Sequence, residues 1–243
     1  MGKRRIDNLL VKRDLAESQA RAQAMLMAGE VTVDGKTVTK AGTLVAEEAI
    51  IVLAEPSPFV SRGGLKLDYA LEQFRLDVSS LVAADIGAST GGFTDCLLQR
   101  SVRRVYAIDA GRGQLDYRLR KDPRVVVMEK TNARNPVALP EKIDLATIDV
   151  SFISVEKIIP PVAQLVKDDG YLLVLVKPQF EARRQEVGRG GVIKESLIHA
   201  RVLGRFIHWT VEHGFRLGGL VASPILGASG NREFFIMLRK DIG

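Results

Sequence analysis

The chain has 243 residues, a length that suits one large domain or a small domain joined to a larger one. Hydrophobic residues make up 46% and charged residues 26%, which excludes a disordered chain, and no apolar run approaches the roughly 18 to 20 residues that span a bilayer. The net charge of +6 favours polyanionic partners, and the single cysteine, Cys96, excludes a disulfide framework. We therefore expect a cytoplasmic globular protein with no stable membrane association.

Two short helices are predicted at the start of the chain. Ile6, Leu9 and Leu10 recur at helical spacing and give a first helix one apolar stripe. Ser18 is a suitable N-cap for a second helix, and Gly29 can end it because glycine enters the left-handed conformation without steric cost.

A β-hairpin and a further strand are predicted next. Val31–Val33 and Lys36–Val38 flank Asp34 and Gly35, a pair of residues typical of tight hairpin turns. Glu48–Leu53 has the composition of another strand. A unit of this size can bury only a small core.

The first 42 residues are also basic. They contain eight lysines and arginines against five aspartates and glutamates, so half of the net charge of +6 lies there. The order of helix, glycine and hairpin resembles the S4 domain, an RNA-binding module, and the resemblance is carried by Arg21, Leu26, Gly29, Val31, Val33 and Gly35. It implies that RNA is bound by Arg4, Arg5, Arg13 and Arg21. The alternative is a structural cap with a solvated basic face.

The chain is predicted to divide near residue 56. Pro56 and Pro58 can continue neither helix nor sheet, so residues 56–60 are expected to link an S4-like α+β domain at 1–55 to a domain at 61–243. In the second domain, helices at Ser154–Val166 and Ser196–His213 alternate with strands. Strands are predicted at Val82–Gly87, Arg103–Asp109, Val125–Glu129, Ile143–Val150, Tyr171–Lys177, Leu217–Ser223 and Glu233–Leu238. This alternation predicts an α/β, Rossmann-like domain with a mostly parallel seven-stranded sheet, whose ligand crevice lies beyond the carboxyl ends of the first strands.

A glycine-rich loop is predicted where the first of these strands turns into a helix. Ser89 replaces the middle glycine of a dinucleotide fingerprint, and the acid before the first glycine, Asp85, suits a ligand with an ammonium group, such as S-adenosylmethionine. Asp109 ends the second strand and can accept hydrogen bonds from both ribose hydroxyls, while Asn132 can meet the adenine edge. The alternative is a structural turn without a ligand. The expected cofactor-binding residues are Asp85, Gly87, Ser89, Gly91, Gly92, Phe93, Asp109 and Asn132.

Four charged residues lie beside otherwise apolar segments. Asp149 and Lys177 close predicted strands, Glu233 opens the last strand, and Lys66 follows the linker. Charges are seldom placed beside buried runs unless they are paired or functional. Taken singly, Lys66 suits a surface helix and Glu233 suits a sheet edge. Together, at the crevice end of the sheet, the four residues predict an active site.

The order and contexts of these residues resemble the Lys-Asp-Lys-Glu tetrad of FtsJ-like ribose 2′-O-methyltransferases. With the S4-like start and the segments Ser61–Leu67, Asp149–Phe152 and Val176–Phe180, the whole chain resembles the TlyA family, whose members are often labelled hemolysins. The resemblance implies a cytidine 2′-O-methyltransferase of 16S or 23S rRNA, or of both. It also implies S-adenosylmethionine as cofactor, rRNA or ribosomal subunits as partners, and a catalytic set of Lys66, Asp149, Lys177 and Glu233.

The chemistry assigns different work to these side chains. A ribose hydroxyl is a poor nucleophile, so an enzyme removes or shares its proton while aiming the oxygen at the methyl group. Lys177 can act as a base if burial and nearby positive charge favour the neutral amine, or it can stay charged and stabilise the developing alkoxide. Asp149 is expected to orient Lys177 and face the cofactor's positive charge, and Glu233 to fix Lys66 and the ribose.

A mobile basic loop is predicted at residues 181–191. Its arginines, Arg183, Arg184 and Arg189, can clamp RNA phosphates over the target sugar. The alternative is an ordinary surface loop.

Three other classes of protein remain open. A noncatalytic RNA-binding or ribosome-assembly factor would bind ribosomes without methyl transfer and would not need Lys177. A membrane-lytic protein, which the hemolysin label suggests, would release liposome contents whether or not Lys177 is present. A Rossmann oxidoreductase would bind NAD(P)H rather than S-adenosylmethionine. No metal site is expected, because the three histidines, His199, His208 and His213, lack ligand spacing.

Overall fold

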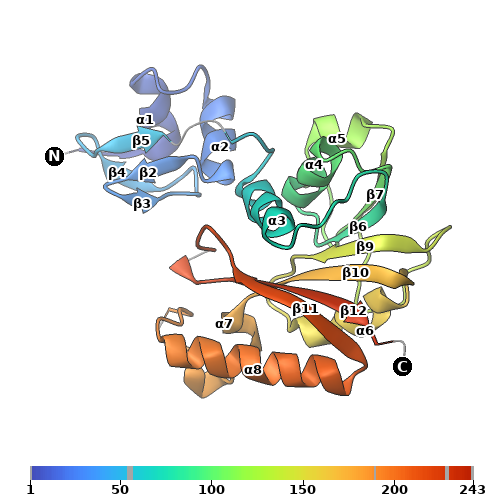
Figure 1. The fold of residues 1–243 in the computed structure, drawn as a ribbon. Coiled ribbons are helices and arrows are strands. Elements are labelled where there is room, and N and C mark those ends of the chain that lie inside the picture. Colours follow the sequence, from blue (N-terminus) through green and yellow to red (C-terminus); the bar gives the residue numbers. More distant parts are fainter. Residues whose placement is uncertain (1, 54–56, 189, 228–229, 242–243) are drawn as a thin grey trace. The chain divides into compact units, whose positions relative to one another are not determined.

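A computed structural model describes residues 2–53, 57–188, 190–227 and 230–241 (Figure 1). The chain forms two compact units, Met1–Arg62 and Gly63–Gly243. Pro56, the first residue of the predicted linker, lies outside the described residues, as does Arg189 of the predicted basic loop.

The first unit consists of two helices and five short strands. Its elements are β1 (Lys3–Arg5), α1 (Ile6–Lys12), α2 (Gln19–Ala28), β2 (Val31–Val33), β3 (Lys36–Thr37), β4 (Leu44–Ala46) and β5 (Ile51–Leu53). The Arg21 N–H donates to Ser18 Oγ at 3.2 Å and so caps α2, which ends at Gly29 with a φ of 74°. Asp34 and Gly35 both have positive φ, as a two-residue hairpin turn requires. The predicted helices and hairpin are confirmed.

The strands of the first unit differ from the prediction in two ways. Residues 47 and 48 form a turn, so the predicted strand Glu48–Leu53 is reduced to β5. In addition, β1 pairs antiparallel with β4 and forms a separate two-stranded sheet, while β3, β2 and β5 form the other sheet in that order. Strands of three residues are too short to show an alternating pattern, so the sequence gives little sign of the β1–β4 pair.

The second unit is built on one seven-stranded sheet. Its strands are β6 (Val82–Ile86), β7 (Arg104–Ile108), β8 (Val125–Met128), β9 (Ile143–Ile148), β10 (Val166–Val176), β11 (Phe215–Ala222) and β12 (Phe234–Lys240). They lie in the order β11-β12-β10-β9-β6-β7-β8, and only β12 runs antiparallel to its neighbours. The predicted mostly parallel sheet is therefore confirmed.

Helices cover both faces of this sheet. They are α3 (Arg62–Gln73), which begins at the boundary between the units, α4 (Gly92–Gln99), α5 (Tyr117–Lys121), α6 (Ile159–Ala163), α7 (Pro178–Glu181) and α8 (Ser196–Glu212), with 3-10 turns η1 (Val155–Lys157) and η2 (Arg184–Glu186). Helices α3, α4 and α5 lie on one face, and α6, α7 and α8 lie on the other (Figure 1). Two covered faces explain why the central strands are mostly apolar.

One predicted helix is much shorter in the structure. The segment Ser154–Val166 contains only η1 and α6, because Pro160 and Pro161 lack the N–H groups that a longer helix would use. Strand β10 already begins at Val166 and shifts its register against β9 before Tyr171. Among the residues that the structure describes, no helix combines the length and the hydropathy needed to cross a membrane.

Candidate active site

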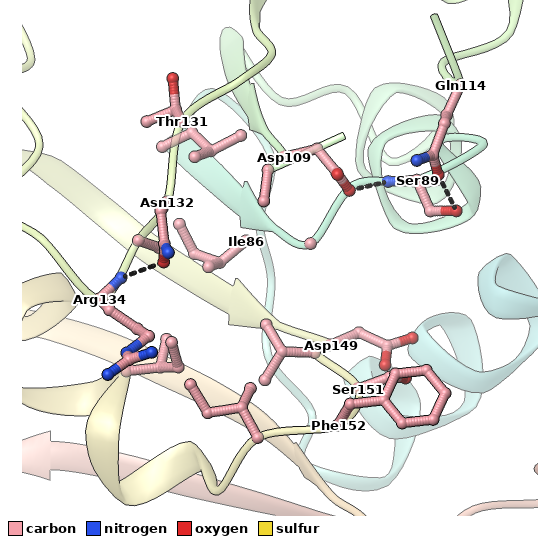
Figure 2. A pocket seen from close by; sticks show the side chains of 17 residues that line it. Ile86, Ser89, Asp109, Gln114, Thr131, Asn132, Arg134, Asp149, Ser151 and Phe152 are labelled. Carbon is pink, nitrogen blue, oxygen red and sulfur yellow. Dashed lines mark hydrogen bonds between the residues drawn. The ribbon is translucent and has the colours of Figure 1, made fainter. Parts of the chain in front are cut away.

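A cavity of about 630 Å³ opens at the carboxyl ends of β6, β7 and β9 (Figure 2). This is the edge of the sheet at which open α/β folds bind ligands. Five of the predicted site residues line the cavity. Four are predicted to bind the cofactor, Gly87, Ser89, Asp109 and Asn132, and the fifth, Asp149, is predicted to be catalytic.

The glycine loop after β6 brings two strand ends into close contact. Gly87 has a φ of +85°, and a Cβ atom there would lie 2.2 Å from the backbone oxygen of Asp149. Gly91 has a φ of +95°, and a Cβ atom there would lie 2.3 Å from Leu119 Cδ1. Both positions therefore need glycine, but only Gly87 lines the cavity.

Asp109 is held at the cavity wall by backbone donors. The Ser89 N–H donates to its Oδ2 at 2.8 Å, and the Gly111 N–H donates to its Oδ1 at 2.6 Å. Each carboxylate oxygen keeps a further lone pair, so the group can still accept hydrogen bonds from a ligand. Ser89 Oγ is directed at Gln114 Oε1, 3.2 Å away (Figure 2).

Asn132 lies on the opposite side of the view in Figure 2 from Ser89. The Arg134 N–H donates to Asn132 Oδ1 at 3.1 Å, which orients the side-chain amide. The amide nitrogen keeps both hydrogens for a ligand, because the carbonyl oxygen takes the internal bond.

Four predicted cofactor residues lie away from the cavity lining: Asp85, Gly91, Gly92 and Phe93. Phe93 is buried beside Phe235, with ring centroids 5.9 Å apart. Asp85 is also buried, and its Oδ2 accepts from the N–H of Thr94 at 2.9 Å and from the Thr94 hydroxyl at 2.7 Å. Burial raises the pKa of the Asp85 carboxyl to about 7, the Thr94 bonds oppose the rise, and the negative charge of Asp149 adds to it.

Asp85→Asn is expected to remove a pH dependence of folding stability. A carboxyl with a folded-state pKa of about 7, against about 3.9 in an unfolded chain, favours its protonated form in the fold. Its contribution to the unfolding free energy therefore falls as the pH rises from about 4 to about 7. Asparagine resembles the protonated acid and does not ionise. The unfolding free energy of the variant should therefore rise by about 1 to 4 kcal/mol relative to that of the wild type as the pH increases across this window. Thermal unfolding between pH 4 and 8 measures the difference.

The same variant tests the position of Asp85 relative to the cofactor. Calorimetric titration should give an S-adenosylmethionine affinity within about threefold of the wild type, because Asp85 is outside the lining. Loss of cofactor binding in a folded Asp85→Asn protein would instead support the role that the sequence suggests.

The predicted catalytic residues form two lysine–carboxylate pairs, and Asp149 of one pair lines the cavity. Lys177 Nζ lies 2.6 Å from Asp149 Oδ1, and Lys66 Nζ lies 2.6 Å from Glu233 Oε2. The two lysine side chains are only 11% and 12% exposed, and that of Glu233 is 2% exposed. Charges this deep are costly unless they are paired, so each lysine depends on its acid.

Strand register brings the two pairs together. Val176 of β10 is opposite Phe234 of β12, so the next residues along, Lys177 and Glu233, face one another across the antiparallel pair. The Asp149 N–H donates to the backbone oxygen of Ile86 at 2.9 Å, which fixes this acid beside the glycine loop. The amine of Lys177 thus contacts Asp149, which lines the cavity together with Gly87 and Asp109.

The segment after Asp149 contains two site residues that the sequence analysis does not single out. Ser151 Oγ accepts a hydrogen bond from Lys177 Nζ at 2.8 Å. Phe152 is 91% exposed and has a φ of +64°, a strained conformation for an aromatic residue. Its ring lies 5.2 Å from that of Phe180. Figure 2 shows Asp149, Ser151 and Phe152 along one rim of the cavity. In the sequence, Ser151 and Phe152 belong to a segment that resembles the family, but nothing there assigns either side chain a role.

A second cavity of about 560 Å³ adjoins the first. The two share Arg134, Phe152 and Ile153. The second is lined in addition by Ser154, Lys157, Gln179 and Phe180. Aromatic rings beside cations are suited to a nucleotide, since a base can stack while its phosphate meets the positive charge.

Three of the four predicted RNA-binding arginines in the first unit already have partners. Arg4 pairs with Glu47 at 2.9 Å, and Arg5 pairs with the buried Asp7 at 2.7 Å. The hydrogen bond from Arg5 is the main cause that lowers the pKa of the Asp7 carboxyl. Arg13 donates to the backbone oxygens of Glu47 and Ala49.

Arg21 differs from these three. It is exposed on α2, and among the described residues its guanidinium has no ion pair. An unpaired, exposed arginine is free to meet a phosphate without breaking an internal contact.

The predicted basic loop is bonded to α8 through Glu186. Glu186 accepts two hydrogen bonds from Arg205 of α8, at 2.9 and 2.6 Å, and these hold the loop to the helix. The Arg205 bonds are the main cause that lowers the pKa of Glu186 to about 2. Arg183 and Arg184 are both exposed, and Arg189 lies outside the described residues.

Comparison with known families matches both units. Residues 59–240 match the FtsJ-like methyltransferase family, and residues 4–51 match the S4 domain. The first match alone spans about three quarters of the chain.

Relatives match over almost the whole length. The chain is 42% identical over 239 residues to the 16S/23S rRNA (cytidine-2′-O)-methyltransferase TlyA of Mycobacterium tuberculosis, covering 97% of this chain and 89% of the relative. It is 38% identical to Hemolysin A of Brachyspira hyodysenteriae, covering 95% of this chain and 97% of the relative. A solved Streptococcus thermophilus structure that carries a hemolysin name has a TM-score of 0.78 and 43% identity, covering all of this chain and 90% of the other. The chain therefore belongs to the FtsJ-like methyltransferase family and has an S4 domain ahead of its methyltransferase domain.

Proposed function

We propose that this chain transfers the methyl group of S-adenosylmethionine to a ribose 2′-hydroxyl of ribosomal RNA. The observation that carries the proposal is the pairing of the four charged residues, Lys177 with Asp149 and Lys66 with Glu233, with Asp149 in the lining of the cavity. The TlyA relative supports a cytidine of 16S or 23S rRNA as the target. We place the reaction in the cytoplasm, on rRNA or on ribosomal subunits, with residues 1–55 binding RNA and residues 61–243 catalysing transfer.

The cavity fits S-adenosylmethionine in size and in chemistry. Its volume of about 630 Å³ is in the range of small-molecule sites. Gly87 has no side chain, which lets the backbone of Asp149 lie close to the glycine loop. Asp109 has lone pairs that can accept hydrogen bonds from a ribose. Asp149 places negative charge where the lining meets the lysine pairs, which favours a positively charged ligand.

The residues of the chain would then perform two tasks in the reaction, one by Lys177 and one by Lys66 with Glu233. S-adenosylmethionine supplies a methyl group on a positively charged sulfur. A bond forms between this carbon and the ribose 2′-oxygen while the carbon–sulfur bond breaks, and the hydroxyl proton leaves. Lys177 accepts that proton or stabilises the oxygen while the proton passes to water. Lys66, which donates a hydrogen bond to Glu233, adds a second positive charge near the sugar.

Recognition of RNA would be divided between the two units. The exposed Phe152, next to the half-buried Phe180, offers aromatic area on which the target base can stack. Arg21 offers an unpaired cation in the S4 domain. Arg13, by contrast, supports the fold of that domain.

Arg21→Ala is expected to weaken RNA binding about 3- to 10-fold and to lower the slope of log affinity against log salt by about one. Arg13→Ala serves as the comparison, because its guanidinium bonds two backbone oxygens and its loss should lower the melting temperature. Filter binding to rRNA fragments at several salt concentrations gives both slopes. Equal slopes for Arg21→Ala and the wild type would remove Arg21 from the RNA interface.

The proposed function is tested by transfer of a tritiated methyl group. Purified protein is incubated with S-adenosylmethionine and with rRNA or ribosomal subunits from a strain that lacks the modification, and the labelled nucleotide is then mapped. The expected result is one or a few ribose-methylated cytidines. Tight ribosome binding without transfer would support an assembly factor instead. Liposome leakage that persists in Lys177→Ala would support a lytic activity.

A further inference from the structure

The hydrogen bonding of Lys177 is asymmetric. Its Nζ donates to Ser151 Oγ at 2.8 Å and also lies 2.6 Å from Asp149 Oδ1. That carboxylate oxygen is buried, yet it accepts no hydrogen bond from any described residue. Asp149 therefore contributes charge at close range, while the direction of the lysine N–H bonds is set by Ser151.

This arrangement leaves Lys177 with a restricted set of orientations. The four substituents of an ammonium nitrogen point to the corners of a tetrahedron, and one of these directions is fixed by the serine. The lysine side chain is only 11% exposed, so water offers few competing partners. If Ser151 were absent, the amine could turn toward the unsatisfied oxygen of Asp149 and away from the sugar.

We infer that Ser151 is a positioning residue, whose hydroxyl holds the Lys177 amine in the orientation that meets the ribose 2′-hydroxyl. The expected effect of Ser151 on the rate rests on the proposed function. Its expected effect on the amine rests only on the contact between Lys177 and Ser151. A correctly aimed amine needs no reorganisation when the ribose arrives, which is the general basis of preorganised catalysis.

The rest of the loop holds Ser151 in place. Ser154 Oγ donates to Glu181 Oε2 at 2.6 Å, and the Val155 N–H donates to Glu181 Oε1 at 2.9 Å. Glu181 lies in α7, and Lys177 is the residue directly before that helix, so the lysine and the acid that anchors the serine loop are only four positions apart. Burial is the main cause that raises the pKa of Glu181, as expected for a carboxyl enclosed between two elements.

Ser151 is a favourable position for mutation because the residue itself is exposed. Its truncation to alanine leaves no buried cavity, so the fold should persist. Threonine keeps the hydroxyl and adds a methyl group that can face solvent. The pair Ser151→Ala and Ser151→Thr therefore separates the hydroxyl from the size of the side chain.

The first test is steady-state methyl transfer at varied RNA concentration. Ser151→Ala should lower kcat about 10- to 100-fold, while KM for RNA and the S-adenosylmethionine affinity stay within about twofold. Ser151→Thr should restore kcat to within about threefold of the wild type. Equal rates for Ser151→Ala and the wild type would overturn the inference and leave the proposed function standing. A threonine variant as slow as the alanine variant would also overturn it.

The second test needs no methyl transfer, so it decides the inference even if the wild type methylates no RNA. The protein is acetylated with an N-hydroxysuccinimide ester, and modification of Lys177 is followed by peptide mass spectrometry. Release from Ser151 should make Lys177 react at least about threefold faster in Ser151→Ala, with Ser151→Thr like the wild type. Unchanged labelling would show that Ser151 does not hold the amine.

Ser154→Ala is the matched control in the same loop. It removes a hydroxyl that binds Glu181 rather than Lys177, so it should lower the melting temperature more than it changes Lys177 labelling. If Ser154→Ala exposed Lys177 as much as Ser151→Ala does, loop rigidity alone would explain the result and the serine–lysine contact would lose its role.

Discussion

Lys177→Ala is expected to lower the rate of methyl transfer at least about 1000-fold, because it removes an amine that contacts Asp149 in the cavity lining and lies at the strand end opposite Glu233. Binding of S-adenosylmethionine should change less than about threefold, since Asp149 keeps its charge at the lining. Single-turnover transfer and calorimetric titration measure the two quantities. A variant that retained a tenth of the wild-type rate would remove Lys177 from the chemistry.

The control for this variant is a lysine with a similar carboxylate contact on the surface. Lys167 pairs with Asp144 at 2.6 Å and is 45% exposed, so Lys167→Ala should leave the rate within about twofold of the wild type. Circular dichroism should show the same fold for both variants. Loss of the Lys177 charge leaves Asp149 without its cation, so some thermal destabilisation is expected without loss of the fold.

Lys177→Arg distinguishes the two possible roles of the lysine. A guanidinium stays protonated in proteins, so it can stabilise a developing alkoxide but cannot accept a proton. Retention of a tenth or more of the wild-type rate would favour electrostatic stabilisation. A loss as deep as that of the alanine variant would favour proton acceptance, provided that S-adenosylmethionine and RNA bind normally.

The meeting of the lysine pairs follows from topology that the sequence makes visible. Apolar segments of strand length predict a parallel sheet, and parallel strands place their carboxyl ends at one edge. Asp149 and Lys177 end two such strands, so their proximity is expected before any side chain is placed. Glu233 joins them because β12 is antiparallel and therefore begins at the same edge.

The direction of a side chain within a loop is much harder to predict. Asp85 precedes the glycine loop as expected, but the first turn of α4 presents Thr94 to it and takes it out of the cavity lining. Ser151 is recognised only when β9 and β10 are paired, because its partner is 26 positions away in the chain. Arg4 likewise meets Glu47 across 43 positions, so its pairing is hidden from local patterns.

Gly87→Ala should abolish detectable binding of S-adenosylmethionine and, with it, methyl transfer. The φ of +85° is unfavourable for alanine, and its Cβ atom would lie 2.2 Å from the backbone oxygen of Asp149. A backbone oxygen cannot move aside as a flexible side chain can, so the ends of β6 and β9 would separate. We expect a weakening of the cofactor affinity of at least about 30-fold and a loss of about 2 to 4 kcal/mol in the unfolding free energy.

Gly214→Ala isolates the contribution of the clash. Gly214 has a φ of +76°, close to that of Gly87, but among the described residues no atom beyond its chain neighbours lies within 4 Å of the position that its Cβ would take. The unfolding free energy of this variant should fall by only about 1 kcal/mol, the cost of the left-handed conformation for alanine. The variant should bind S-adenosylmethionine as the wild type does. If Gly87→Ala behaved in titration and thermal unfolding as Gly214→Ala does, the contact between the glycine loop and Asp149 would not shape the site. If Gly87→Ala alone lost the cofactor, the close approach of β6 and β9 would be what aligns the methyl donor with the lysine pairs.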